Sequence, residues 1–138
     1  MTAVISKEGT GFFAVEIDGV ASTANAGQGS IANPWGHDVF ITRAYIITSV
    51  ISTGSANLGI GITTAAAKGT DILNDLDMNG VTVDFAYNGF AIMPTASTVL
   101  VPAVWTSALF LTFTGSATMA GFKGTLYLET LPTTVENT

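Results

Sequence analysis

The segment from Asn33 to Ser52 constrains the fold more than any other part of the chain. It opens with the turn-forming residues Asn33, Pro34 and Gly36 and continues as VFITRAYIITSVIS. β-Branched and aromatic residues suit a pleated, half-buried surface, so this run predicts a long strand. Neither alternate set of its side chains is cleanly polar, and both faces are therefore expected to be covered. Such a strand is central to its sheet, or its outer face meets another subunit.

The remainder of the chain predicts an all-β protein. Gly-rich turns separate further apolar and Thr-rich runs, and residues 65–80 hold the one segment expected to be helical or irregular. About eight strands with almost no helix indicate an antiparallel β-sandwich or barrel, for which a jelly roll is the best match. The other expected strands are residues 2–6, 11–17, 57–63, 81–86, 97–104, 107–114 and 122–131.

Two glycines in the run NLGIGIT carry a separate prediction. Leu58, Ile60 and Ile62 share one face of the expected strand, and Gly59 and Gly61 lie on the other. Glycine on an outer face is typical of a place where another backbone approaches closely. We therefore expect a second chain segment, or a second subunit, against this face.

The length of 138 residues fits a single domain. Within it we expect an N-terminal arm with the first strands in residues 1–32, a β-sandwich body in residues 33–131, and a C-terminal tail in residues 132–138. The N-terminus shows no signal-peptide pattern, and Gly, Pro, Ser and Thr interrupt the uncharged runs, so no transmembrane helix is expected.

Charged residues are scarce, and this limits the possible partners. They make up 10% of the chain, against about 25% in typical proteins, and the net charge is −6. Four scattered cations cannot neutralise a nucleic-acid backbone or bind an anionic membrane. Much of the surface is then expected to be buried against other chains, the alternative being an extracellular β-domain with a neutral, Thr-rich surface. The chain has no cysteine, which excludes disulfides and thiolate metal sites.

No residue pattern predicts an enzyme or a cofactor. His37 and Asp38 are adjacent, but no G-x-S-x-G motif supplies a nucleophile for a Ser-His-Asp triad. Asp75, Asp77 and Asn79 match the start of a calcium loop, D-x-D-x-N-G, whose twelfth position would be Ala86 instead of a glutamate. The same residues also fit an Asx-rich turn that binds local backbone groups. They form a weak calcium candidate.

Aromatic residues in and near expected turns are the other candidates. Trp35, Tyr45, Tyr87 and Trp105 could stack against a sugar, and they are equally suited to the core or to an interface. The residues we expect at an interface are Phe12, Phe13, Trp35, Arg43, Tyr45 and Trp105.

Four segments together resemble a family of small structural proteins of tailed phages. They are Asn33-Pro-Trp-Gly-His-Asp-Val-Phe-Ile-Thr-Arg, then TGSA, then DILNDLDMNG, then the closing GFKGTLYLE. In that family a turn of the form N-P-x-G-x-D leads into a hydrophobic strand that ends near an arginine, and the chain closes with a G-x-L-Y strand. The similarity covers residues 33–129.

The resemblance implies a jelly-roll-like virion protein without catalytic residues, in which DILNDLDMNG is a structural loop. The implied role is a capsid decoration (cement) protein that binds the major capsid protein of the same virion. It would be assembled in the host cytoplasm, with a homotrimer on a three-fold axis as the expected oligomer. The alternative is a glycan- or receptor-binding jelly roll of a phage tail or fibre, which would use Trp35 and Trp105.

Overall fold

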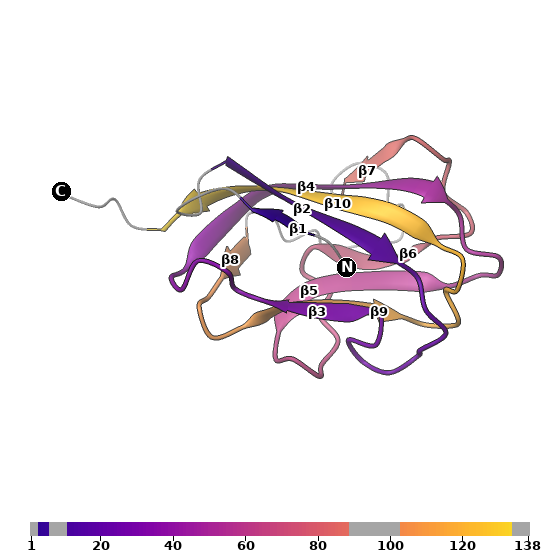
Figure 1. The fold of residues 1–138 in the computed structure, drawn as a ribbon, viewed down its shortest axis with the longest axis horizontal. Coiled ribbons are helices and arrows are strands. Elements are labelled where there is room, and N and C mark those ends of the chain that lie inside the picture. Colours follow the sequence, from indigo (N-terminus) through magenta and orange to yellow (C-terminus); the bar gives the residue numbers. More distant parts are fainter. Residues whose placement is uncertain (1–2, 6–10, 89–102, 134–138) are drawn as a thin grey trace.

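The computed structural model describes residues 3–5, 11–88 and 103–133. These residues form two antiparallel sheets that pack face to face (Figure 1). None of them belongs to a helix that could cross a bilayer. The strands are β1 (Ala3–Ile5), β2 (Gly11–Asp18), β3 (Gly29–Ala32), β4 (Val39–Val50), β5 (Asn57–Thr63), β6 (Leu73–Asp77), β7 (Ala86–Asn88), β8 (Ala103–Trp105), β9 (Phe110–Gly115) and β10 (Lys123–Pro132).

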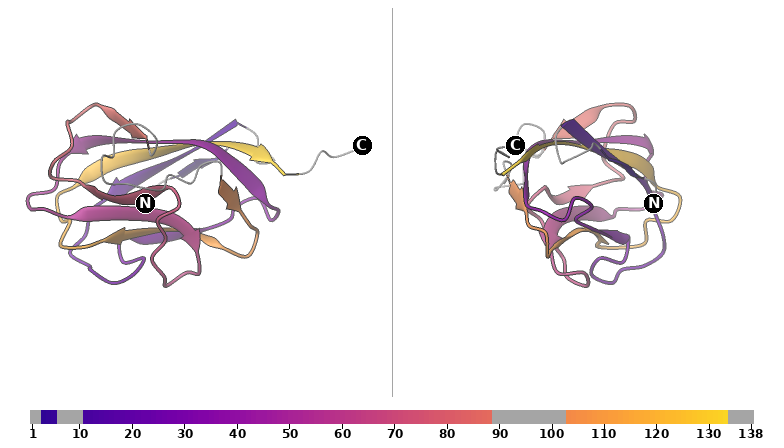
Figure 2. Two further views of the ribbon diagram at one scale, coloured as in Figure 1. Left: turned by 180° about the vertical axis from the view of Figure 1, so that it is seen from behind. Right: turned by 60° about the vertical axis from the view of Figure 1, so that its left-hand side comes forward.

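The strand order confirms the predicted jelly roll. The first sheet has the order β1-β2-β10-β4-β7, with β8 also paired to β4, and the second has the order β3-β9-β5-β6. The antiparallel pairs β2–β10, β3–β9, β4–β7 and β5–β6 are nested along the chain and alternate between the two sheets. A long hairpin folded at β5–β6 and rolled up in this way is the jelly roll. Views from behind and from the side show the same two layers (Figure 2).

β4 is an interior strand of the first sheet, as its sequence predicts, but the described chain does not cover its outer face, where Phe40 and Arg43 are exposed. It lies between β10 on one side and β7 and β8 on the other. Glu129 of β10 is paired with Arg43 and the next residue, Thr130, with Ile41, so Thr42 is an extra residue in a β-bulge. The bulge inverts the alternation: Ile41 is buried before it and Ala44 after it. This inversion explains why neither alternate set of β4 residues is uniformly polar.

The core fills the space between the two sheets. Alternate residues of β2 and β10 point inward, as the regular pattern of residues 122–131 predicts, and they meet β5 and β9 from the opposite sheet. The segment 1–32 is not separate from the body, because β2 belongs to the first sheet and β3 to the second. The largest fully buried side chains are Trp105, Phe13, Phe113, Phe122, Ile17, Ile41, Ile46, Leu58, Ile60, Met78, Leu111 and Met119.

The chain itself covers the outer face of the second sheet. The loop after β5 crosses back over it, and a Cβ on Gly61 would lie 2.5 Å from the Cα of Gly69. Thr112 and Thr114 of β9 are buried on the same face, where the hydroxyl of Thr114 accepts a hydrogen bond from the backbone N–H of Ala26 at 2.9 Å. The predicted close approach of another backbone is therefore confirmed, and it comes from the same chain.

Two sequence-based assignments differ from the structure. Residues 65–80 contain no helix, and Leu73–Asp77 form the edge strand β6 beside β5. Residues 81–85 are a turn instead of a strand, since Asp84 has a positive φ of 65° that breaks the extended run, and Ala86 already begins β7. The expected strand 97–104 lies mostly outside the described residues, and β8 takes its last two positions.

Gly61→Ala tests whether the loop after β5 must contact the sheet directly. The added methyl would overlap the backbone of Gly69, so the loop must move away, at a cost of about 1–3 kcal/mol in unfolding free energy. Gly54→Ala is the matched control, because a Cβ there meets nothing within 4 Å. Urea unfolding of both variants measures the difference, and equal midpoints would contradict the described packing.

Candidate interaction surfaces

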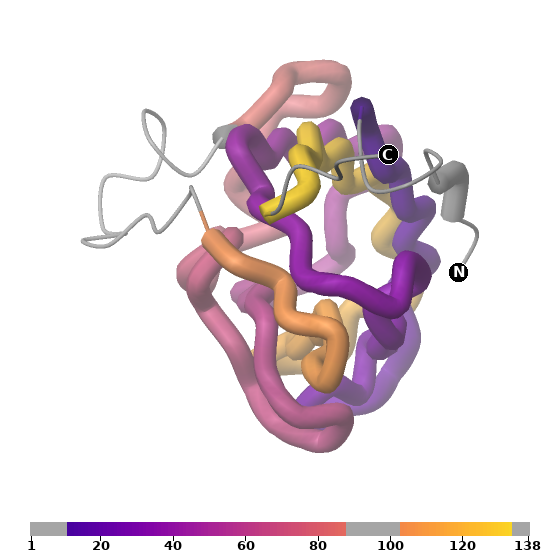
Figure 3. The backbone as a smooth tube through the Cα atoms, turned by 90° about the vertical axis from the view of Figure 1, so that its left-hand side faces the viewer, coloured from indigo at the N-terminus to yellow at the C-terminus, as the bar shows by residue number. Residues whose placement is uncertain are grey.

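The side chain of Asn33 holds the turn that leads into β4. Its Oδ1 accepts hydrogen bonds from the backbone N–H groups of Trp35 and Gly36 at 2.9 and 3.2 Å. Its Nδ2 donates to the carbonyl oxygens of His37 and Trp105 at 3.0 and 3.1 Å. Figure 3 views this end of the sandwich, with the purple segment before β4 and the orange segment before β9 in front. The turn is therefore fastened to β8, far along the chain.

Three aromatic rings pack behind this turn. Phe13, Trp35 and Trp105 contact one another edge to face, with ring centroids 5.6 to 5.8 Å apart. The indole Nε1 of Trp105 donates to the carbonyl oxygen of Leu109 at 3.0 Å. Phe13 and Trp105 are fully buried, and Trp35 is partly buried against the core. The sequence placed all three at an interface, whereas the structure places two of them where no partner can reach.

This burial bears on the sugar-stacking hypothesis. A stacking platform needs an exposed ring face, and Trp105 has none. Tyr87 packs against the core and its hydroxyl accepts a hydrogen bond from the N–H of Thr82 at 2.6 Å. Tyr45 is partly exposed on the outer face of β4. The four aromatics therefore do not share one exposed surface.

His37 and Asp38 have local structural partners. His37 is exposed, and its Nδ1 lies 3.1 Å from the carbonyl oxygen of Asp38. The Asp38 carboxylate accepts a hydrogen bond from the backbone N–H of Ser107 at 2.8 Å, so it does not orient the imidazole. Asp38 therefore joins the start of β4 to the turn before β9.

The D-x-D-x-N-G segment is the end of β6 followed by an Asx turn. Asp75 lies within 2.9 Å of Lys68 Nζ through both carboxylate oxygens. Asp77 Oδ1 accepts a hydrogen bond from the N–H of Asn79 at 3.0 Å, and Asn79 Nδ2 donates to the carbonyl oxygen of Ser52 at 2.8 Å. In the described part of the chain, no three His, Cys, Asp or Glu side chains gather to hold a metal ion.

The outer face of the first sheet carries an exposed apolar surface, which we call the face patch. Its members are Phe12 of β2, Phe40 of β4, Val104 of β8 and Leu131 of β10, between 39% and 56% exposed. Phe40 lies directly opposite both Leu131 and Val104 in the register, so these three side chains form one row across the sheet. Unlike the second sheet, this face leaves large apolar side chains open to solvent.

An ion pair lies within the face patch, in the row that contains Phe12, because Glu129 is in register with both Phe12 and Arg43. Arg43, in register with Glu129, approaches it no closer than 3.9 Å, and their side chains are 64% and 52% exposed. The bulged Thr42 donates its hydroxyl proton to Glu129 Oε1 at 2.9 Å. An exposed pair at this distance contributes little to stability, so the guanidinium of Arg43 remains available to a partner.

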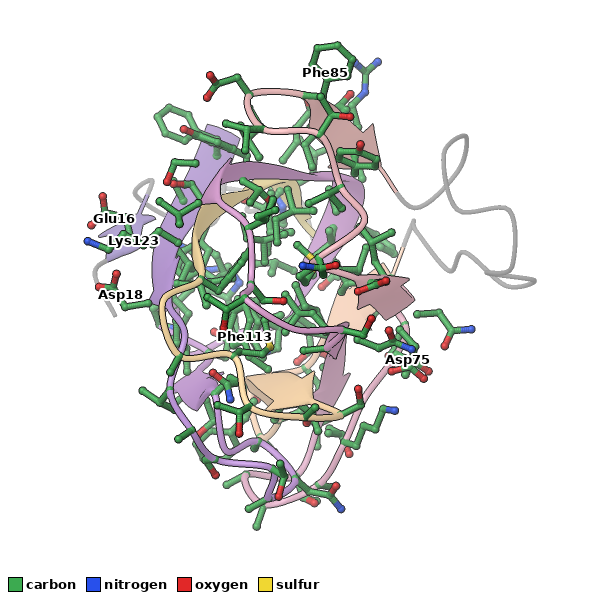
Figure 4. All side chains as sticks on the ribbon, turned by 90° about the vertical axis from the view of Figure 1, so that its right-hand side faces the viewer. Glu16, Asp18, Asp75, Phe85, Phe113 and Lys123 are labelled. Atoms are coloured by element: carbon green, nitrogen blue, oxygen red, sulfur yellow. The ribbon has the colours of Figure 1, made fainter. Side chains whose placement is uncertain are left out.

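A second apolar surface, which we call the tip patch, lies at the far end of β4. Its members are Val50, Ile51, Val83 and Phe85. The N–H of Asp84 donates to the carbonyl oxygen of Thr48 at 2.9 Å, which holds the turn against the end of β4. At 62%, Phe85 is the most exposed of the large hydrophobic residues of the described chain, and its ring points away from both sheets (Figure 4).

Sequence reasoning identified only part of these surfaces. Phe12 and Arg43 were predicted and are exposed, whereas Phe40 was not, because the bulge that points it outward has no signature in the sequence. The tip patch was missed entirely, since alternation in VTVDFA is typical of a strand. Its one local signal is Asp84, a residue type that tolerates a positive φ.

Comparisons of the chain with protein-family models, with curated proteins and with solved structures find no match.

Trp105→Ala tests the structural role of the aromatic cluster. It removes a fully buried indole together with its edge-to-face contacts to Phe13 and Trp35. The expected loss in unfolding free energy is about 3–5 kcal/mol. Phe85→Ala is the control: it removes an exposed ring and should change stability by less than about 0.5 kcal/mol. Thermal unfolding followed by circular dichroism measures both. Similar losses in the two variants would show that the cluster does not hold this end of the sandwich.

Proposed function

We propose that this protein is a structural subunit of a tailed-phage virion, a decoration protein that binds the assembled head and stabilises it. The resemblance of residues 33–129 to small tailed-phage structural proteins supports the class. The jelly-roll fold is the one that this resemblance implies. The proposal assigns no catalytic step to any residue.

The observation that carries the proposal is that the chain covers the outer face of one sheet and leaves the outer face of the other exposed. The second sheet is covered by the chain's own loops, with Gly61 against Gly69. The first sheet and its end expose Phe12, Phe40 and Phe85. Contiguous apolar surface on a soluble protein usually marks an interaction site. Few charges oppose burial of this surface against a neighbouring subunit.

Such a protein stabilises a capsid by mass action. If it binds the assembled lattice and not the free capsid subunits, it shifts the equilibrium toward the closed shell. Several modest contacts on linked subunits add avidity without any single strong contact. The partner in this proposal is the major capsid protein of the same virion, the oligomer is a trimer, and the location is the outer capsid surface.

The N-terminal arm is the element we assign to the capsid contact. β1 is held to the edge of β2 by three residue pairs, whereas β2 is held to β10 by eight. β1 therefore has fewer ladder pairs than β2, as do β7 and β8 with three each, and it lies at the end of the sheet order. An edge strand with unpaired backbone groups is suited to adding or exchanging a partner strand.

Cosedimentation with phage heads tests the function. Purified protein added to expanded heads of its own phage that lack it should pellet with them and raise their resistance to heat. Free capsid subunits should not retain it. Absence of binding to heads would overturn the proposal.

Deletion of residues 1–10 tests the assignment of the arm. The truncated protein should keep its sandwich, because β2 stays paired with β10, and it should lose head binding. Deletion of residues 134–138 removes a short segment from the other terminus as a matched control and should leave binding unchanged. Full binding by the first variant would refute the arm model while leaving the function open.

A further inference from the structure

The face patch and the tip patch lie at opposite ends of the longest strand. Phe40 is the second residue of β4 and Val50 is the last. A strand advances about 3.3 Å per residue, so ten residues separate the two patches by about 33 Å. One copy of the chain cannot bring its own two patches together. A contact between a face patch and a tip patch therefore requires two copies of the chain.

Each patch has a cation and an anion close to it, Arg43 and Glu129 at the face and Lys123 and Asp84 at the tip, so the two sets can pair across a contact. Asp84 lies in the tip patch between Val83 and Phe85, and among the described residues its carboxylate has no ion pair within 4 Å. Arg43 lies beside the face patch with its distant contact to Glu129. An arginine fork binds a carboxylate in a bidentate manner, which adds orientation as well as attraction.

The backbone of the tip supports a role in contact. Asp84 holds a φ of 65°, a left-handed conformation that Asp adopts more readily than most non-glycine residues. The hydrogen bond to Thr48 holds this conformation, and its effect is to place Phe85 outside the sandwich. A turn that places a large aromatic ring in solvent is suited to contact with a partner.

We propose that copies of this chain associate head to tail, with the tip patch of one copy docked on the face patch of the next and Asp84 facing Arg43. A contact between two different surfaces is heterologous, and it closes into a ring when the rotation between copies allows. This inference rests on the part of the proposed function that makes the chain an oligomer, and it names the surfaces that join the copies.

The size of the patches fits a contact that depends on ring closure. With side chains of 150–250 Å² and the exposed fractions above, each patch offers on the order of 300 Å² of apolar surface. A stable pairwise interface usually buries about 1,200–2,000 Å² in total, so one such contact alone is weak. In a closed ring every subunit makes the contact twice, once through its face patch and once through its tip patch. The contact that closes the ring forms within one assembly, so it is intramolecular.

Sedimentation equilibrium of the purified full chain, without capsids, tests the contact. The wild type should be an oligomer, and Phe85→Glu in the tip and Leu131→Glu in the face should each raise the dissociation constant by about 30-fold or more. Ala66→Glu places the same charge on an exposed residue of the loop after β5 and should leave the oligomer intact. Thermal unfolding of each variant checks that the fold is retained.

Mixing the two variants distinguishes a head-to-tail contact from a symmetric one. Phe85→Glu keeps an intact face and Leu131→Glu keeps an intact tip, so the mixture should form one-to-one dimers and no ring. Because a single contact is weak, these dimers should populate only at the highest protein concentrations, where neither variant alone forms them. A Phe85→Glu protein that oligomerises like the wild type would show a symmetric face-to-face contact and overturn the inference.

The remaining outcomes separate this inference from the proposed function. A wild-type protein that stays monomeric at its highest soluble concentration overturns the head-to-tail contact. If that monomer still binds heads, and Leu131→Glu abolishes the binding, the occupant of the face patch is the capsid and only the inference fails. An oligomer that ignores heads leaves the inference standing and overturns the function.

Discussion

The packing of Trp105 against Phe13 and Trp35 is the interaction on which this end of the jelly roll depends. Phe13 belongs to β2, Trp105 to β8, and Trp35 to the turn between β3 and β4, so three distant parts of the chain meet in one cluster. Asn33 adds hydrogen bonds that tie the same turn to the carbonyl oxygen of Trp105. The turn therefore fixes where β4 begins. Since β4 pairs with β10, β7 and β8, the position of its first residues sets the register of much of the first sheet.

The sequence predicts the fold well where one regular period governs a segment. Leu58, Ile60 and Ile62 alternate with glycine and form β5, and the alternation from Phe122 to Leu131 forms β10. It predicts less well where local geometry breaks the period. The bulge at Thr42 inverts the two faces of β4, and the positive φ of Asp84 converts an alternating run into a turn. Both depend on contacts with distant residues, such as Glu129 and the carbonyl of Thr48, which a single sequence does not reveal.

The interaction surfaces could also be predicted only in part from the sequence, for a different reason. Aromatic residues are enriched in cores and in interfaces alike, so residue type could not separate Phe12, which is exposed, from Phe13, which is buried. Adjacent strand residues point to opposite faces, and only the pairing of β2 decides which one faces the core. Arg43 could be predicted as exposed from its charge alone. Phe85 could not, because its exposure follows from the backbone of the residue before it.

The low number of charged residues has a different consequence for each of the two sheets. On the second sheet, small residues let the chain cover its own face, with Gly61 and Gly69 in direct backbone contact. On the first sheet, Phe40, Val104 and Leu131 stay open. Arg43 and Glu129 are the charges next to this row, and a larger number would oppose any contact through the cost of their desolvation. The few charges beside the open patches come in both signs, Arg43 and Glu129 at the face and Asp84 and Lys123 at the tip. The arrangement lowers the cost of burying the patches and gives the contact a direction.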